Sequence, residues 1–116
     1  MTLRDRDAFL WDMLQAARKI EDFIGRAGLD DYQSNDLLRS AVERQFLIIG
    51  EAASQCVRRF PELKEEIGDI DRIVAFRNRL VHGYAVISDD VVWAIAHDEL
   101  PRLRDDIQRL IGDAAT

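Results

Sequence analysis

Apolar residues recur every three or four positions along most of this chain, and this spacing determines the class of fold it can adopt. The first such series, behind a Thr2–Asp5 cap pattern, comprises Phe9, Met13, Ala16, Ile20 and Phe23. Only six glycines and two prolines interrupt 116 residues, a composition that favours helices over a turn-rich β protein. We therefore predict an all-α protein that forms a single domain over residues 1–116.

Capping and helix-breaking residues set the expected bounds in the first half of the chain. The first helix should end near Gly25, and residues 25–33 are predicted to form a loop. Ser34 is then expected to cap a long second helix that ends at Pro61.

The second half is divided in the same way. A short helix should close at Gly68, and a further helix should stop at Gly83. Ser88 begins the last helical region, which Pro101 must kink or restart. The expected architecture is an up-and-down bundle of four to five helices.

Location and redox state follow from what the sequence lacks. No apolar run approaches the roughly 20 residues of a membrane-spanning helix, and the N-terminus has no apolar signal core. We expect a soluble, cytoplasmic protein with no membrane partner.

The single cysteine, Cys56, lies in an apolar stripe and is predicted to be a core residue.

Charge is distributed unevenly. The net charge is −6, which argues against nonspecific binding to nucleic acid. Residues 72–88 nevertheless contain three arginines and no acid, a local charge of +3 that leaves −9 on the remainder. This pattern predicts a small anion site on an acidic body.

The residues with catalytic chemistry gather in one segment, Arg77-Asn78-Arg79-Leu80-Val81-His82-Gly83-Tyr84. Neither a cofactor nor a metal is implied, because the sequence has no Gly-rich phosphate loop, no cysteine pair and no metal-binding histidine spacing. On a regular helix Arg77 and His82 would be about 140° apart, whereas Asn78 and His82 would share a face. Convergence would require the helix to end near His82, or a second chain. Spacing alone favours the structural alternative of solvated arginines with His82 in a helix C-cap.

A family resemblance reverses this balance. The segment from Arg77 to Tyr84, with Val92-Trp93, Asp98-Glu99-Leu100-Pro101 and the stretch from Glu43 to Ala52, resembles the HepT-like branch of the HEPN superfamily. The Arg-x4-His-x-Tyr motif of that branch falls on Arg77, His82 and Tyr84. The resemblance implies a dimeric bundle of four to five helices and a toxin that cleaves RNA without metal.

The resemblance also implies roles that suit these side chains. His82 would move protons between the ribose 2′-hydroxyl and the leaving oxygen, and Arg77 would stabilise the charge that develops on the phosphate. Arg79 would help to position phosphate, or would be solvated. Asn78 would orient the phosphate or His82, or would only cap the helix.

Tyr84 has a regulatory role in the family. The resemblance implies that a nucleotidyltransferase antitoxin attaches AMP to this tyrosine and so blocks the ribonuclease. The structural alternative is a ring that covers the helix end.

Two other functions compete with this one. A non-catalytic helical module could bind a nucleotidyltransferase partner or a nucleotide, because a fold alone does not establish activity. A general helical adaptor would tolerate replacement of Arg77 and His82. Glu43, Arg44 and Glu51 are expected in salt bridges or on a solvated face, with a buried polar contact near the site as the alternative. His97 is expected to be a solvated helix residue rather than a second catalytic histidine.

Overall fold

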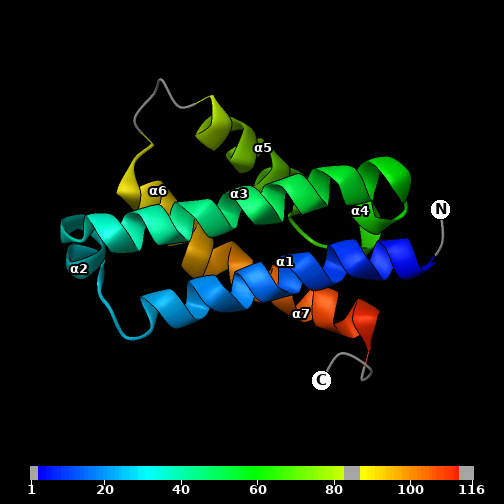
Figure 1. The fold of residues 1–116 in the computed structure, drawn as a ribbon, viewed down its shortest axis with the longest axis horizontal. Helices are drawn as coiled ribbons and strands as arrows, with labels where there is room; N and C mark the ends of the chain where they lie inside the picture. Colours follow the sequence, from blue (N-terminus) through cyan, green and yellow to red (C-terminus); the bar gives the residue numbers. More distant parts are fainter. Residues whose placement is uncertain (1–2, 83–86, 113–116) are drawn as a thin grey trace.

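The computed structural model describes residues 3–82 and 87–112, which contain seven α-helices, one π-helix and no strand. Residues 89–111 form one continuous helical stretch, so these ranges comprise four long helical segments and the two short helices α2 and α4 (Figure 1). The bounds are α1 Leu3–Ile24, α2 Leu29–Ser34, α3 Asp36–Arg59, α4 Leu63–Glu66, α5 Ile70–Val81, α6 Asp89–Ala94, η1 Ile95–Glu99 and α7 Leu100–Ile111. The predicted all-α bundle is confirmed.

The bundle is built around the antiparallel pair α1 and α3, with α7 against α1 and α5 against α3 (Figure 1). Each helix turns a stripe of apolar residues toward its neighbours, and removing this surface from water is the main stabilising contribution to the fold. Residues with no exposed surface in this core include Leu10, Met13, Leu14, Ile20, Val42, Ile49, Leu100, Leu103 and Ile107.

The loop expected over residues 25–33 is wrong in its second part, which forms the short helix α2. Tyr32 of this helix is fully buried and packs on Trp93 with ring centroids 5.5 Å apart. The burial of a large ring decides the structure of so short a segment, whose own helical propensity is weak.

The cap of α3 is displaced by one residue from the prediction. Asn35, not Ser34, caps this helix, because its side chain accepts a hydrogen bond from the backbone N–H of Leu38 at 3.0 Å. Ser34 is instead the last residue of α2, and its hydroxyl donates to the carbonyl of Asp30 at 2.9 Å.

The roles predicted for Ser88 and Pro101 in the last helical region are confirmed. The hydroxyl of Ser88 accepts a hydrogen bond from the N–H of Asp90 at 3.2 Å at the start of α6. Pro101 lies in the first turn of α7, directly after η1. In a regular helix the ring of Pro101 would clash with the carbonyl of His97, four residues earlier, and this carbonyl lies within the wider π turn.

Cys56 is buried in the core, as predicted. Burial raises the pKa of its thiol to about 11, which makes the thiolate scarce and the group unreactive. Within residues 3–82 and 87–112, no helix combines the length and apolar character needed to cross a membrane.

Candidate functional site

The site begins with a close contact between α3 and α5. Gly50 is buried in α3 directly beneath Arg77 of α5. A Cβ at position 50 would overlap the Cβ of Arg77 and would lie 2.5 Å from its Cγ. Only glycine therefore permits this approach of the two helices, which places the base of the Arg77 side chain.

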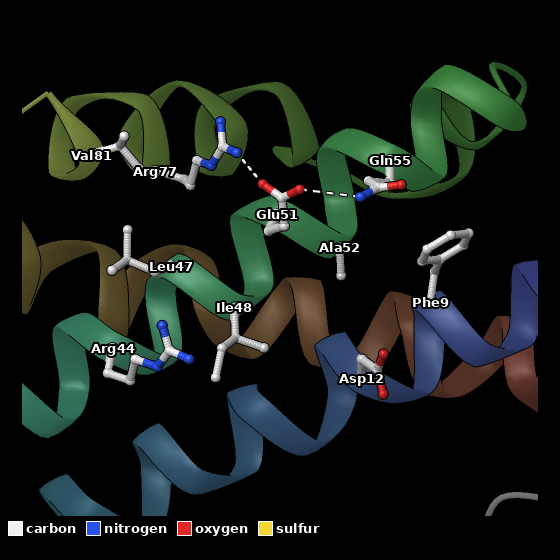
Figure 2. A pocket seen from close by; sticks show the side chains of 10 residues that line it. All are labelled: Phe9, Asp12, Arg44, Leu47, Ile48, Glu51, Ala52, Gln55, Arg77 and Val81. Carbon is white, nitrogen blue, oxygen red and sulfur yellow. Dashed lines mark hydrogen bonds and ion pairs between the residues drawn. The ribbon is translucent and has the colours of Figure 1, made fainter.

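The guanidinium of Arg77 is held by two neighbours. It forms an ion pair with Glu51, and its Nη1 donates to Oδ1 of Asn78 at 2.6 Å. Glu51 in turn accepts a hydrogen bond from Gln55 at 3.1 Å, so a continuous polar chain crosses from α3 to α5 (Figure 2). The hydrogen bonds from Gln55 and Arg77 lower the pKa of Glu51. Because Glu51 is half exposed, this pair contributes orientation more than stability.

Arg77 faces a cavity of about 480 Å³ between α1, α3 and α5. In Figure 2 the side chains of Arg44 and Asp12 lie on the side of α1, across the cavity from Arg77. The remaining lining is mostly apolar and comprises Phe9, Leu47, Ile48, Ala52 and Val81, with Glu51 and Gln55.

His82 is the C-cap of α5, and its ring is exposed. Its backbone N–H donates to the carbonyl of Asn78 at 3.1 Å. The helix thus ends just before His82, as one of the two conditions for convergence required. His82 nevertheless lines a different pocket of about 300 Å³, which it shares with Asn78, Arg79 and Ile87.

The structure does not bring Arg77 and His82 into one cavity. Asn78 connects the two sites, because its side chain contacts the Arg77 guanidinium while it lines the pocket of His82. Arg79 is exposed and has no ion-pair partner within the described ranges. Tyr84, the expected modification site, lies outside the described residues.

The chemistry available here is that of an oriented guanidinium and an accessible imidazole. Such a pair can stabilise an oxyanion on phosphorus and move a proton. In the part of the chain that the structure describes, no three side chains of His, Cys, Asp or Glu are grouped so that they could hold a metal ion.

The sequence-based prediction assigned no role to one residue of the site, Gly50, and only a general role to another, Glu51. Gly50 was not singled out, although a glycine in the middle of a 24-residue helix often marks a close helix contact. Glu51 was expected in a salt bridge or on a solvated face, and it has both properties. His97 is exposed as expected, with its Nδ1 2.9 Å from the carbonyl of Trp93.

Comparison with known proteins assigns the sequence to a family. The model of the family described as "Ribonuclease HepT-like" matches residues 13–110. A protein of Methanocaldococcus jannaschii named "Putative RNase MJ1380" is 30% identical over 93% of this chain and 98% of its own length. A second protein of that organism, "Putative RNase MJ1216", is 28% identical over 97% of this chain and 93% of its own.

A third relative carries the family name. "Probable ribonuclease HepT" of Thermococcus cleftensis is 27% identical over 92% of this chain and 96% of its own length. No solved structure matches the chain with comparable significance. Because the family match extends over most of the sequence and includes Arg77 and His82, the protein belongs to the HepT-like ribonuclease family.

Proposed function

We propose that this protein is a metal-independent endoribonuclease that uses Arg77 and His82. One observation carries the proposal: the C-terminal end of α5 carries a guanidinium held by Glu51 and Asn78 and, five residues later in the sequence, an exposed imidazole. Neither the guanidinium of Arg77 nor the imidazole of His82 is part of the buried core. A solvated arginine would not require the polar chain that orients Arg77.

The proposed reaction is an internal transesterification. The imidazole of His82 accepts the proton of the ribose 2′-hydroxyl, whose oxygen attacks phosphorus as the bond to the 5′-oxygen breaks. The imidazolium of His82 then returns this proton to the leaving 5′-oxygen, so the products are a 2′,3′-cyclic phosphate and a 5′-hydroxyl, and His82 is neutral again. Arg77 stabilises the additional negative charge on the phosphoryl oxygens during attack.

The test is cleavage of labelled RNA by the purified protein. We expect His82→Ala and Arg77→Ala to abolish cleavage while the helical circular dichroism is retained, with Arg26→Gln as a matched surface control. Activity should survive excess chelator. Products with a 5′-phosphate, or cleavage restored by a divalent ion after chelation, would contradict the mechanism.

We further propose that the active form is a homodimer. Arg77 and His82 line separate cavities of one chain, and the Arg77 cavity is largely apolar with a rim residue, Val81, that is 55% exposed. A second copy could cover this surface and bring the two groups to one phosphate. Mixing inactive Arg77→Ala with inactive His82→Ala protein should then restore partial activity. Sedimentation as a monomer at concentrations of full activity would contradict the dimer.

The family resemblance supports one more proposal, that the protein is a toxin silenced by a nucleotidyltransferase antitoxin. The Tyr84 hydroxyl would attack the α-phosphorus of ATP and release pyrophosphate, leaving AMP on the ring. The charge and volume of this AMP group, two residues beyond His82, would compete with the RNA phosphate for the site. Intact-mass analysis after co-expression should show AMP increments that Tyr84→Phe abolishes. An unmodified tyrosine in a neutralised complex would contradict it.

A further inference from the structure

A second groove lies on the other side of α5 and leads toward His82. One wall is a stripe of α5, with Arg72, Ala75, Phe76 and Arg79 at helical spacing. The opposite wall comes from the continuous stretch of α6, η1 and α7, and the volume is about 540 Å³. Arg79 lines this groove and also the pocket of His82, so the two hollows adjoin.

The π-helix supplies a buried carboxylate to this groove. Glu99 is 6% exposed, and it forms an ion pair with Arg72 at 2.9 Å. Its second oxygen is buried without a hydrogen-bond partner within the described residues. Burying a carboxylate is costly, and π turns often occur at functional sites because they re-aim a side chain. Glu99 therefore has a role that core packing does not explain.

Two of the three arginines of the groove, Arg72 and Arg102, are held by carboxylates but remain exposed. Glu99 fixes Arg72, and Asp69 fixes Arg102 at 2.7 Å, yet the two arginine side chains remain 69% and 64% exposed. Each guanidinium has five N–H donors, so these pairs leave several donors directed to solvent. The apolar residues that line the groove, which we call its floor, are Ala75, Phe76, Val91, Ala94 and Ile95.

We infer that this groove binds the RNA strand that flanks the scissile phosphate. The inference rests on the proposed ribonuclease function and names how its substrate is held. Arg79 contacts the phosphate nearest His82, and Arg72 and Arg102 contact phosphates farther along, while bases pack on the apolar floor. Arg72 and Arg79 are seven residues apart, about 10 Å along the helix, the rise of about three stacked nucleotides.

The two acidic residues of the groove, Asp98 and Glu99, have opposite expected effects on RNA binding. Glu99 acts as a positioning residue for Arg72, whereas Asp98 lies exposed on the same wall with no ion-pair partner among the described residues. Asp98 should repel the strand. Its neutralisation should therefore tighten RNA binding, an effect opposite to that of removing an arginine.

The experiment measures binding separately from cleavage. Fluorescence anisotropy with labelled single-stranded RNA of 4 to about 12 nucleotides uses protein that carries His82→Ala, so that the RNA stays intact. We expect Arg72→Gln, Arg79→Gln and Arg102→Gln each to weaken binding about threefold to tenfold, with a deficit that grows with RNA length. Each lost phosphate contact should lower the slope of log K against log salt by about 0.7. Asp98→Asn should strengthen binding.

Arg26→Gln is the matched control, because Arg26 is exposed and lines none of the described cavities. Groove variants that bind RNA like this control, in a protein whose parent cleaves RNA, would overturn the groove and leave the proposed function standing. A parent protein without any cleavage would overturn the proposed function, while the binding series would still decide the groove. Circular dichroism identifies any variant that fails to fold.

Discussion

Substituting Gly50 with alanine tests whether the contact of α3 with α5 positions the guanidinium of Arg77. The new methyl group would overlap the Cβ of Arg77 and lie 2.5 Å from its Cγ. An ordinary carbon–carbon contact is about 3.5–4.0 Å, so the two helices must separate locally by about 1 Å or more. The atoms that clash belong to the base of the side chain, where rotation offers no escape.

The expected magnitude follows from two opposing contributions. Alanine in a helix interior is favoured over glycine by about 1 kcal/mol, whereas overpacking a close contact costs about 1–3 kcal/mol. We expect the free energy of unfolding to fall by up to about 2 kcal/mol, and the melting temperature by about 4 °C per kcal/mol. A displacement of Arg77 by about 1 Å should lower cleavage by about 10-fold to 100-fold.

The assay combines urea unfolding with RNA cleavage by the same preparations. Gly28→Ala is the matched control, because the nearest atom to a Cβ at position 28 is 3.9 Å away. A double-mutant cycle with Arg77→Gly adds specificity, since removing the Cβ at position 77 relieves the clash whereas Arg77→Ala retains it. The coupling free energy between Gly50→Ala and Arg77→Gly should be favourable and larger than that with Arg77→Ala.

A Gly50→Ala protein with the stability and cleavage rate of the parent would refute the role given to this contact. So would equal coupling with Arg77→Gly and Arg77→Ala, because the destabilisation would then arise elsewhere than at the Cβ of Arg77.

Three further predictions follow from single residues. Burial raises the pKa of Cys56 to about 11 in the folded state, so the unfolded chain loses its thiol proton at a lower pH. The free energy of unfolding should therefore fall by up to about 2–3 kcal/mol between pH 9 and 11. Urea unfolding at several pH values should show this decline, and Cys56→Ala should flatten it. Ser88→Ala should cost about 1 kcal/mol by removing the cap of α6, and a cost below about 0.3 kcal/mol would show that the cap is dispensable. Since the folded pKa of Glu51 is lowered, its small contribution to stability should be present above about pH 4.5 and disappear as the pH falls further. The Glu51→Gln protein should lack this pH dependence. It should also cleave RNA several-fold more slowly, because Arg77 is less constrained.

The helices that sequence patterns predicted are those with a long apolar stripe or a clear cap. Ser88, Pro61 and Pro101 mark boundaries correctly because capping and the loss of a backbone donor are local effects. The short helix α2 could not be predicted in this way. Its structure depends on Tyr32 packing against Trp93, a residue 61 positions away in the sequence.

The site shows the same division between local and long-range information. The motif pointed to Arg77 and His82. Their separation of about 140° on a regular helix predicted that the two side chains diverge. The partners of Arg77 on α3 depend on the register of two helices, which one glycine sets. The π turn that directs Glu99 toward Arg72 has no signal in the sequence beyond the proline that follows it.

The distribution of charge leads to a last prediction, about the rate at which RNA associates. The chain carries −6 overall, and −9 outside residues 72–88. At low salt this acidic body repels RNA over long distances, whereas at 0.1 M salt the Debye length is about 10 Å and only the nearby arginines act on the strand. The association rate constant should therefore stay flat or rise between about 10 and 100 mM salt, while the dissociation rate constant rises, because the local arginine contacts weaken. Stopped-flow anisotropy with the His82→Ala protein separates the two constants. An association rate that falls steeply over this range would mean that a basic surface far larger than residues 72–88 steers the RNA.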